Sequence, residues 1–166
     1  MVVNAAGSYD ANEPNWGNHS PFTTAGSPYS NLMEDEIFTT AAQTLTLSGL
    51  AANQSFNLVI YSAGDQNLGT GNTEKEGTFT VNGVTQNTVW MGTASTLING
   101  LTYVQFSAQS DGAGNLIINW GGTPAGTGIN QETDMNGFQL ETIPEPGTLA
   151  LAGAGMALSL LARRRK

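Results

Sequence analysis

The fold is decided by the run Phe56-Asn57-Leu58-Val59-Ile60-Tyr61, which is the most strand-like segment of the chain. Aromatic and β-branched residues pack well on a pleated surface, and this run contains both. Its apolar side chains fall on both faces of an extended backbone, because successive side chains of a strand point in opposite directions. We therefore expect residues 56–61 to form a central strand.

Shorter runs of the same kind flank this segment. Thr44-Leu45-Thr46-Leu47 alternates polar and apolar residues, which is typical of a strand with one face on a core. Asn82-Gly83 is a strong hairpin signal, because both residues tolerate the positive φ angles of a two-residue turn. The predicted strands are residues 32–40, 44–47, 56–61, 78–81, 88–91, 103–107, 116–120 and 137–141.

The predicted strands define an all-β domain over residues 1–142. No part of this region keeps a helical period beyond two turns, and Gly and Asn separate the strands. Such spacing is typical of an antiparallel β-sandwich of the jelly-roll kind. Residues 4–31 are rich in Asn, Gly, Pro and Ser and are predicted to form a loop. Its aromatic residues, Trp16 among them, either plug the end of the core or line a ligand platform.

The C-terminal tail, residues 143–166, has a different composition. It consists of the motif Ile143-Pro144-Glu145-Pro146-Gly147, a charge-free run over residues 148–162, and the cations Arg163, Arg164, Arg165 and Lys166. Lipid solvates such a run better than water does, so we predict one short C-terminal transmembrane helix. Its length would be about 22 Å, less than the ~30 Å hydrocarbon core. The terminal cations stay on the cytoplasmic side, which places residues 1–142 outside the cytoplasm.

Pro144, Glu145 and Pro146, followed by the apolar run and the basic cluster, resemble the PEP-CTERM sorting signal of Gram-negative bacteria. The resemblance implies that an exosortase, a membrane enzyme, cleaves near the Pro-Glu-Pro and releases or transfers the exported protein. The chain would be held transiently in the inner membrane and would then reach the cell surface or the extracellular matrix. A plain tail anchor and a buried hairpin helix are the alternatives.

A second resemblance covers most of residues 9–141. The order of Leu32-Met33-Glu34-Asp35, the strand runs and the closing Asn136-Gly137-Phe138-Gln139-Leu140 is similar to exported proteins of Planctomycetes and Verrucomicrobia. Their domains resemble galactose-binding-like jelly rolls, which open with a strand before a Trp-containing loop. This chain offers at most Val2-Val3-Asn4 there, and Met1 begins no signal peptide. We therefore expect an N-terminal strand and a signal peptide upstream of this sequence.

The charge of the body is strongly acidic. Lys75 is the only Lys or Arg before residue 163 and stands against 13 Asp and Glu, so residues 1–162 carry a formal charge of −12. Such a surface repels phosphate backbones, which excludes nucleic acid as a partner. The chain has no Cys, so neither disulfides nor thiolate metal sites are available.

No constellation of residues indicates catalysis. His19 is the sole His, and no Cys or Gly-x-Ser-x-Gly motif supplies a nucleophile. Glu34 and Glu36 share one face of a predicted strand while Asp35 points to the other, so the three do not form an obvious acid pair. We therefore predict that the protein is not an enzyme and has no catalytic residue.

Two acidic loops contain the oxygen ligands that calcium prefers. They are Asp65-Gln66-Asn67 and Asp111-Gly112-Ala113-Gly114-Asn115, and neither has the 12-residue spacing of an EF-hand. Both are typical turn sequences, because Asp and Asn side chains bond to their own backbone. We predict no metal site and no cofactor, with structural calcium as the alternative.

Carbohydrate binding is the main alternative function of the body. Aromatic rings stack on sugars while Asp and Asn bind hydroxyl groups, and Trp16, Asp65 and Asn67 are the candidate ligand-binding residues. Trp90 and Trp120 lie in predicted strands and are expected in the core. The sequence thus predicts a non-enzymatic exported protein with a structural or adhesive role, with extracellular polysaccharide as a candidate partner. A carbohydrate-binding module is the alternative.

Overall fold

The chain folds into antiparallel β-sheets in a computed structural model, which describes residues 7–10, 30–33, 35–39, 41–62, 75–90, 96–121 and 133–144. A single helical turn, α1 (Ser30–Met33), precedes β2. The strands are β1 (Gly7–Asp10), β2 (Asp35–Thr39), β3 (Gln43–Leu47), β4 (Ser55–Tyr61), β5 (Lys75–Val81), β6 (Val84–Trp90), β7 (Tyr103–Gln109), β8 (Leu116–Trp120), β9 (Thr133–Met135) and β10 (Gly137–Thr142). The predicted all-β antiparallel class is confirmed for these residues.

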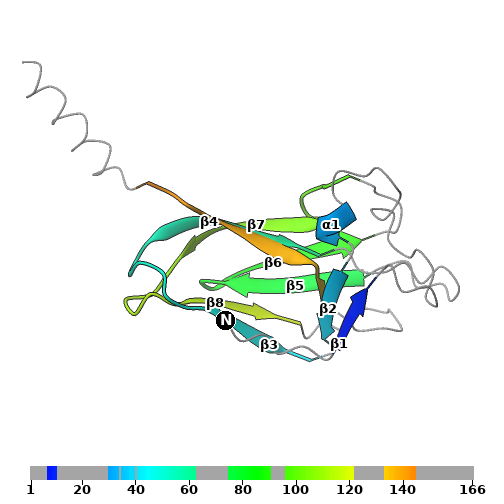
Figure 1. Cartoon of the computed structure of the whole chain (residues 1–166), viewed down its shortest axis with the longest axis horizontal. Helices are drawn as coiled ribbons and strands as arrows, with labels where there is room; N and C mark the ends of the chain where they lie inside the picture. The colour runs from blue at the N-terminus through cyan, green and yellow to red at the C-terminus, as the bar shows by residue number, and fades with distance from the viewer. Residues whose placement is uncertain are drawn as a thin grey trace, which may run out of the picture.

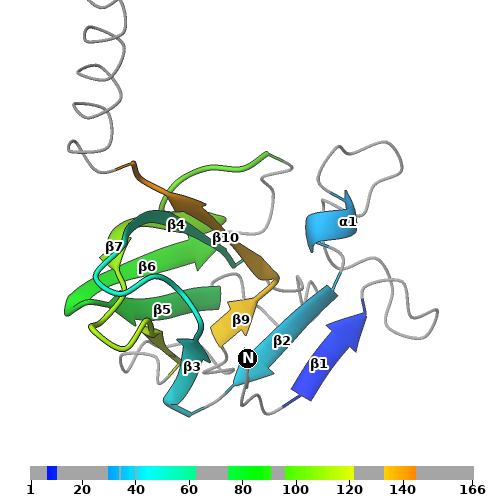
Figure 2. The ribbon, with the colours of Figure 1, turned by 60° about the vertical axis from the view of Figure 1, so that its left-hand side comes forward.

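Two sheets face each other across the core (Figure 1). One has the strand order β10-β4-β7 and the other has the order β3-β8-β5-β6. A third sheet, β1-β2-β9, lies beside them at one end (Figure 2). Only Asn136 separates β9 from β10, so the chain passes directly from the β1-β2-β9 sheet into the β10-β4-β7 sheet. The arrangement is a β-sandwich with a small sheet added.

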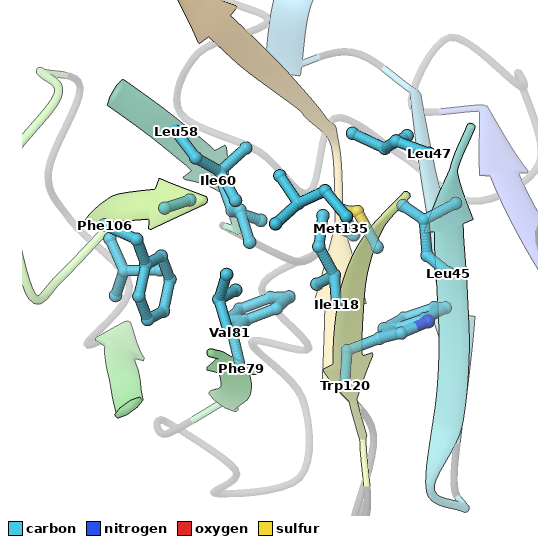
Figure 3. Close-up of a cluster of buried hydrophobic side chains, with 13 residues drawn as sticks. Leu45, Leu47, Leu58, Ile60, Phe79, Val81, Phe106, Ile118, Trp120 and Met135 are labelled. Atoms are coloured by element: carbon cyan, nitrogen blue, oxygen red, sulfur yellow. The ribbon is translucent and has the colours of Figure 1, made fainter. Parts of the chain in front are cut away.

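Alternation of buried and outward side chains builds the core. Every second side chain is buried in β4, β7 and β8. Trp120 is 1% exposed at the end of β8, which confirms its predicted place in the core. Burying a Leu, Ile or Phe side chain contributes roughly 1.5–3 kcal/mol. Figure 3 labels Leu45, Leu47, Leu58, Ile60, Phe79, Val81, Phe106, Ile118, Trp120 and Met135 in this cluster.

The predicted central strand is confirmed, since β4 lies between β10 and β7. Its two faces are not equivalent. Phe56, Leu58 and Ile60 point into the core, while Val59 and Tyr61 on the other face are half-buried. β4 is therefore central because it pairs with a strand along each edge, and not because both of its faces are buried.

The β5–β6 hairpin turns at Asn82-Gly83, as predicted. Asn82 has a φ of 48° and Gly83 a φ of 79°, which is the conformation of a type I′ turn. The second strand was predicted at residues 88–91, but β6 begins at Val84, which pairs with Val81. The polar residues after the turn misled the prediction, because the outward face of a strand accepts polar side chains.

Three short elements depart from the prediction. The predicted strand over residues 32–40 is divided into α1 and β2, and Met33 of α1 is 1% exposed. The predicted loop over residues 4–31 contains β1, which pairs with β2. β9 was not predicted either. β1 also provides a strand ahead of Trp16 in the sequence, where we expected at most Val2-Val3-Asn4.

No helix in the described residues is long and apolar enough to cross a membrane. Residues 148–162, for which the sequence predicts a transmembrane helix, lie outside the described part of the chain. The side chain of Trp90, expected in the core, lies outside it as well.

We predict that two neighbouring isoleucines of β8 differ sharply in their contribution to stability. Ile118 is 0% exposed, whereas Ile117 is 47% exposed on the outward face. Ile118→Ala should lower the free energy of unfolding by about 2–5 kcal/mol, because it opens a cavity in the core. The matched control Ile117→Ala should lower it by less than about 1 kcal/mol. Urea unfolding followed by tryptophan fluorescence measures both, and equal losses would contradict the assigned register of β8.

Candidate functional site

The candidate functional site is the junction between β10 and the C-terminal tail. β10 (Gly137–Thr142) is an edge strand and pairs with β4 along its whole length. The ladder continues by one residue, because the Ile143 N–H donates to the Ser55 carbonyl at 2.9 Å. Pro144 follows and is exposed. Within the described part of the chain, Ile143 is the last residue that continues the ladder.

A glutamine side chain fixes this last residue. Gln54 Nε2 donates to the carbonyl of Ile143 at 3.0 Å and to the carbonyl of Ser55 at 3.1 Å. Both backbone groups of Ile143 are thus hydrogen-bonded to the segment that enters β4. We call the contacts among Gln54, Ser55, Ser110 and Ile143 the Gln54 clamp.

The clamp is anchored in the interior through Ser110. The Gln54 N–H donates to Ser110 Oγ at 3.0 Å, and the Ser110 N–H donates to the Gln54 carbonyl at 3.0 Å. Ser110 is 2% exposed, and its hydroxyl donates to the Ala51 carbonyl at 2.6 Å. A continuous set of hydrogen bonds therefore runs from a buried serine after β7 to the residue that precedes Pro144.

The clamp lies at the end of the sandwich formed by residues 48–54, 82–83 and 110–115, which we call the turn end (Figure 1). A groove of about 450 Å³ opens there. Asn82 bonds with its amide to both backbone groups of Gln109, at 2.9 and 3.0 Å. Gln109 Nε2 donates to the Asn53 carbonyl at 3.1 Å. The groove is lined by Asn53, Asn82, Gly83, Gln109, Ser110, Asp111, Asn115, Ile117 and Asn119.

Asp111 organises the β7–β8 turn beside the groove. Its Oδ1 accepts hydrogen bonds from the backbone N–H groups of Asn115 at 2.8 Å and Ala113 at 2.9 Å. These bonds, the one from Asn115 above all, hold the pKa of the Asp111 carboxyl below its usual value. Gly114 follows with a φ of 77°, and the Leu50 carbonyl leaves no room for a Cβ there. The predicted turn role of residues 111–115 is confirmed.

Calcium has no obvious set of ligands in the residues that the structure describes. No group of three or more His, Cys, Asp or Glu gathers there. Oδ1 of Asp111, the acid of the second predicted loop, accepts hydrogen bonds from the backbone N–H groups of Ala113 and Asn115. Asp65 and Asn67 of the first loop lie outside the described residues. The calcium alternative therefore stays a prediction.

Two buried carboxyl groups lie on one face of the β2–β9 pair. Glu36 is 7% exposed and Asp134 is 2% exposed. Asp134 is opposite Phe38, and Glu36 is two residues from Phe38, so all three side chains share a face. The sequence pattern pointed to acids within residues 34–36 and not to Asp134. No local pattern indicates it, because the pairing that brings the two strands together is not local.

The remaining predicted site residues lie outside the described part of the chain. The structure describes Pro144 alone of the sorting motif. Asp65 and Asn67 belong to the connection that follows Ser62. Ser62 comes directly after the end of β4 that is far from Ser55, and the two ends of this strand are about 20 Å apart. The residues outside the description are Trp16, His19, Glu34, Asp65, Asn67, Glu145, Pro146, Arg163, Arg164, Arg165 and Lys166.

A family model described as the PEP-CTERM protein-sorting motif matches residues 142–166. The resemblance of the tail is confirmed by this match, which begins at the last residue of β10. The motif implies an exported protein with a C-terminal membrane-anchoring signal. No curated protein matches the sequence, so the resemblance to proteins of Planctomycetes and Verrucomicrobia gains no support.

The fold is similar to plant receptor ectodomains. The ANX2 ectodomain from Arabidopsis thaliana aligns with a TM-score of 0.60 at 14% identity, over 87% of this chain and 42% of that one. The ANXUR1 extracellular domain from the same plant aligns with a TM-score of 0.55 at 13% identity, over 86% of this chain and 40% of that one. This chain thus spans less than half the length of either structure. Identities this low indicate a shared fold alone.

We predict that Asp111 makes stability depend on pH. Because its folded pKa is lowered, its contribution is present above the unfolded pKa of about 3.9 and is lost as the pH falls through the folded pKa. Asp111→Asn should therefore have a lower urea midpoint than the natural protein at pH 7, and the two midpoints should converge as the pH falls below the folded pKa of Asp111. A difference that stays constant or widens on acidification would show that the carboxylate does not stabilise the turn.

Proposed function

We propose that the protein is an exported, non-enzymatic surface or extracellular-matrix component with a structural or adhesive role, sorted by an exosortase-type enzyme. The observation that carries this proposal is the position of the sorting motif. The matched segment starts at Thr142, where β10 ends, and the last clamped residue is Ile143. Signal and body therefore abut without a spacer.

The charge-free run provides the membrane step. Residues 148–162 form a short anchor, and the four terminal cations prevent it from passing through the bilayer. A short span of this kind holds the protein weakly, because the flanks must be drawn in or the bilayer thinned. Weak anchoring suits a signal that is removed after it has been read.

The geometry supports an orientation of the anchored body. Four residues separate Ile143 from Thr148, and the five Cα–Cα steps between these two residues reach at most about 18 Å when extended. The turn end must then face the membrane within that distance. Asp111 is the only ionisable residue among the nine that line its groove, so this end adds little charge to the approach. The opposite end, from which residues 63–74 leave β4, faces away from the membrane.

The test follows the C-terminus of the full chain in a bacterium that has an exosortase-type enzyme. We expect the membrane-bound precursor to give a product that ends near Pro144-Glu145-Pro146, as read by intact mass spectrometry. Replacing the terminal cations should abolish most of this product, because the run then loses its orientation signal. The variant is Arg163→Ser, Arg164→Ser, Arg165→Ser and Lys166→Ser.

The matched control keeps the charge and changes only the side chains, with Arg163→Lys, Arg164→Lys and Arg165→Lys. It should be processed like the natural protein. Equal processing of the serine variant, or recovery of all protein from the cytosol with its tail intact, would contradict the proposal.

A second measurement addresses the carbohydrate-binding alternative. The processed body is applied to an array of arabinose- and galactose-type glycans. The structural role predicts no selective binding. Selective binding that is lost in Trp16→Ala would favour the carbohydrate-binding module.

A further inference from the structure

The processing signal lies directly next to a backbone that is already paired along one edge. Processing enzymes bind an extended substrate through its free backbone groups, and β10 already uses one edge of its backbone to pair with β4. The Gln54 clamp continues this protection through Ile143, whose N–H and carbonyl are both bonded. Availability to an enzyme therefore changes abruptly between Ile143 and Pro144.

Gln54 fixes the body side of this boundary. It cannot release Ile143 easily, because its own backbone is bonded in both directions to the buried Ser110. The next residue, Pro144, is exposed. Fraying of β10 from the tail is thus limited at Ile143.

We propose that Gln54 is a positioning residue for processing of the C-terminal signal, because its side chain sets the upstream limit of cleavage at Ile143. The inference rests on the proposed sorting function and assigns one residue a role in the cleavage step. Cleavage breaks one peptide bond downstream of Ile143. With water as the acceptor, the body gains a new carboxylate and the tail a new ammonium group. The enzyme thus receives the Pro-Glu-Pro from a rigid end, and the product keeps all of β10.

The clamp itself is tested without any enzyme, by hydrogen exchange of the full chain in detergent micelles. Gln54→Leu removes the donor to Ile143, and the exchange of the Ile143 amide should speed up roughly three- to tenfold, as expected for one lost hydrogen bond. Gln54→Glu replaces the donor by an acceptor facing two carbonyls and should speed it up further. Unchanged exchange in both variants would overturn the proposal.

Gln109→Leu is the matched control. Its Nε2 also donates to a backbone carbonyl of the turn end, that of Asn53, but it makes no contact with Ile143. The control should leave the exchange of the Ile143 amide unchanged. An equal effect of Gln109→Leu and Gln54→Leu would mean that the turn end loosens as a whole, which would overturn a specific role for Gln54.

The consequence is tested by mass spectrometry of the processed product in the exosortase-containing host. The natural protein and Gln109→Leu should give one C-terminus at or after Pro144, whereas Gln54→Leu and Gln54→Glu should add products that end upstream of it. A single unchanged C-terminus in both Gln54 variants would overturn the inference and leave the sorting proposal intact. Absence of any processed product from the natural protein would overturn both.

Discussion

The architecture depends on the pairing of β4 along both of its edges. β7 and β10 are its partners, and β10 comes from the far end of the folded chain. Such a pairing closes a long loop at an entropic cost, which burial of the sheet faces must offset. The pairing also determines which segments leave the sandwich at each end of β4. Ser55 meets Ile143 where the tail leaves, and Tyr61 meets Gly137 where residues 63–74 depart.

Local patterns predicted the parts of the fold that are stabilised by local rules. The alternation in residues 44–47 and 103–107 located β3 and β7, and Asn82-Gly83 located a hairpin whose turn requires positive φ angles. β1 and β9 escaped because they are only three or four residues long and rich in polar residues. Their strand conformation comes from pairing with β2, and no window of the sequence contains that information.

The same division applies to the site. The sorting motif is contiguous, so its residue types and order were sufficient to identify it, and the family match agrees. Gln54 gave no signal, because its partner lies 89 residues away and a glutamine in a turn is unremarkable in a sequence. Asp134 was missed for the same reason. The absence of enzymatic activity stays a prediction, since neither the similarity of fold nor the motif bears on it.

The amide of Asn82 protects the outer edge of β7. β7 is the outer strand of its sheet, and a free outer strand is a template on which other chains assemble into aggregates. The Asn82 amide bonds to the backbone N–H and carbonyl of Gln109 as a neighbouring strand would. Gln86 Nε2 donates to the Gln105 carbonyl at 2.6 Å. Side chains from the facing sheet thus form hydrogen bonds with the backbone of β7 at two points. This edge is therefore less available to a strand of another chain.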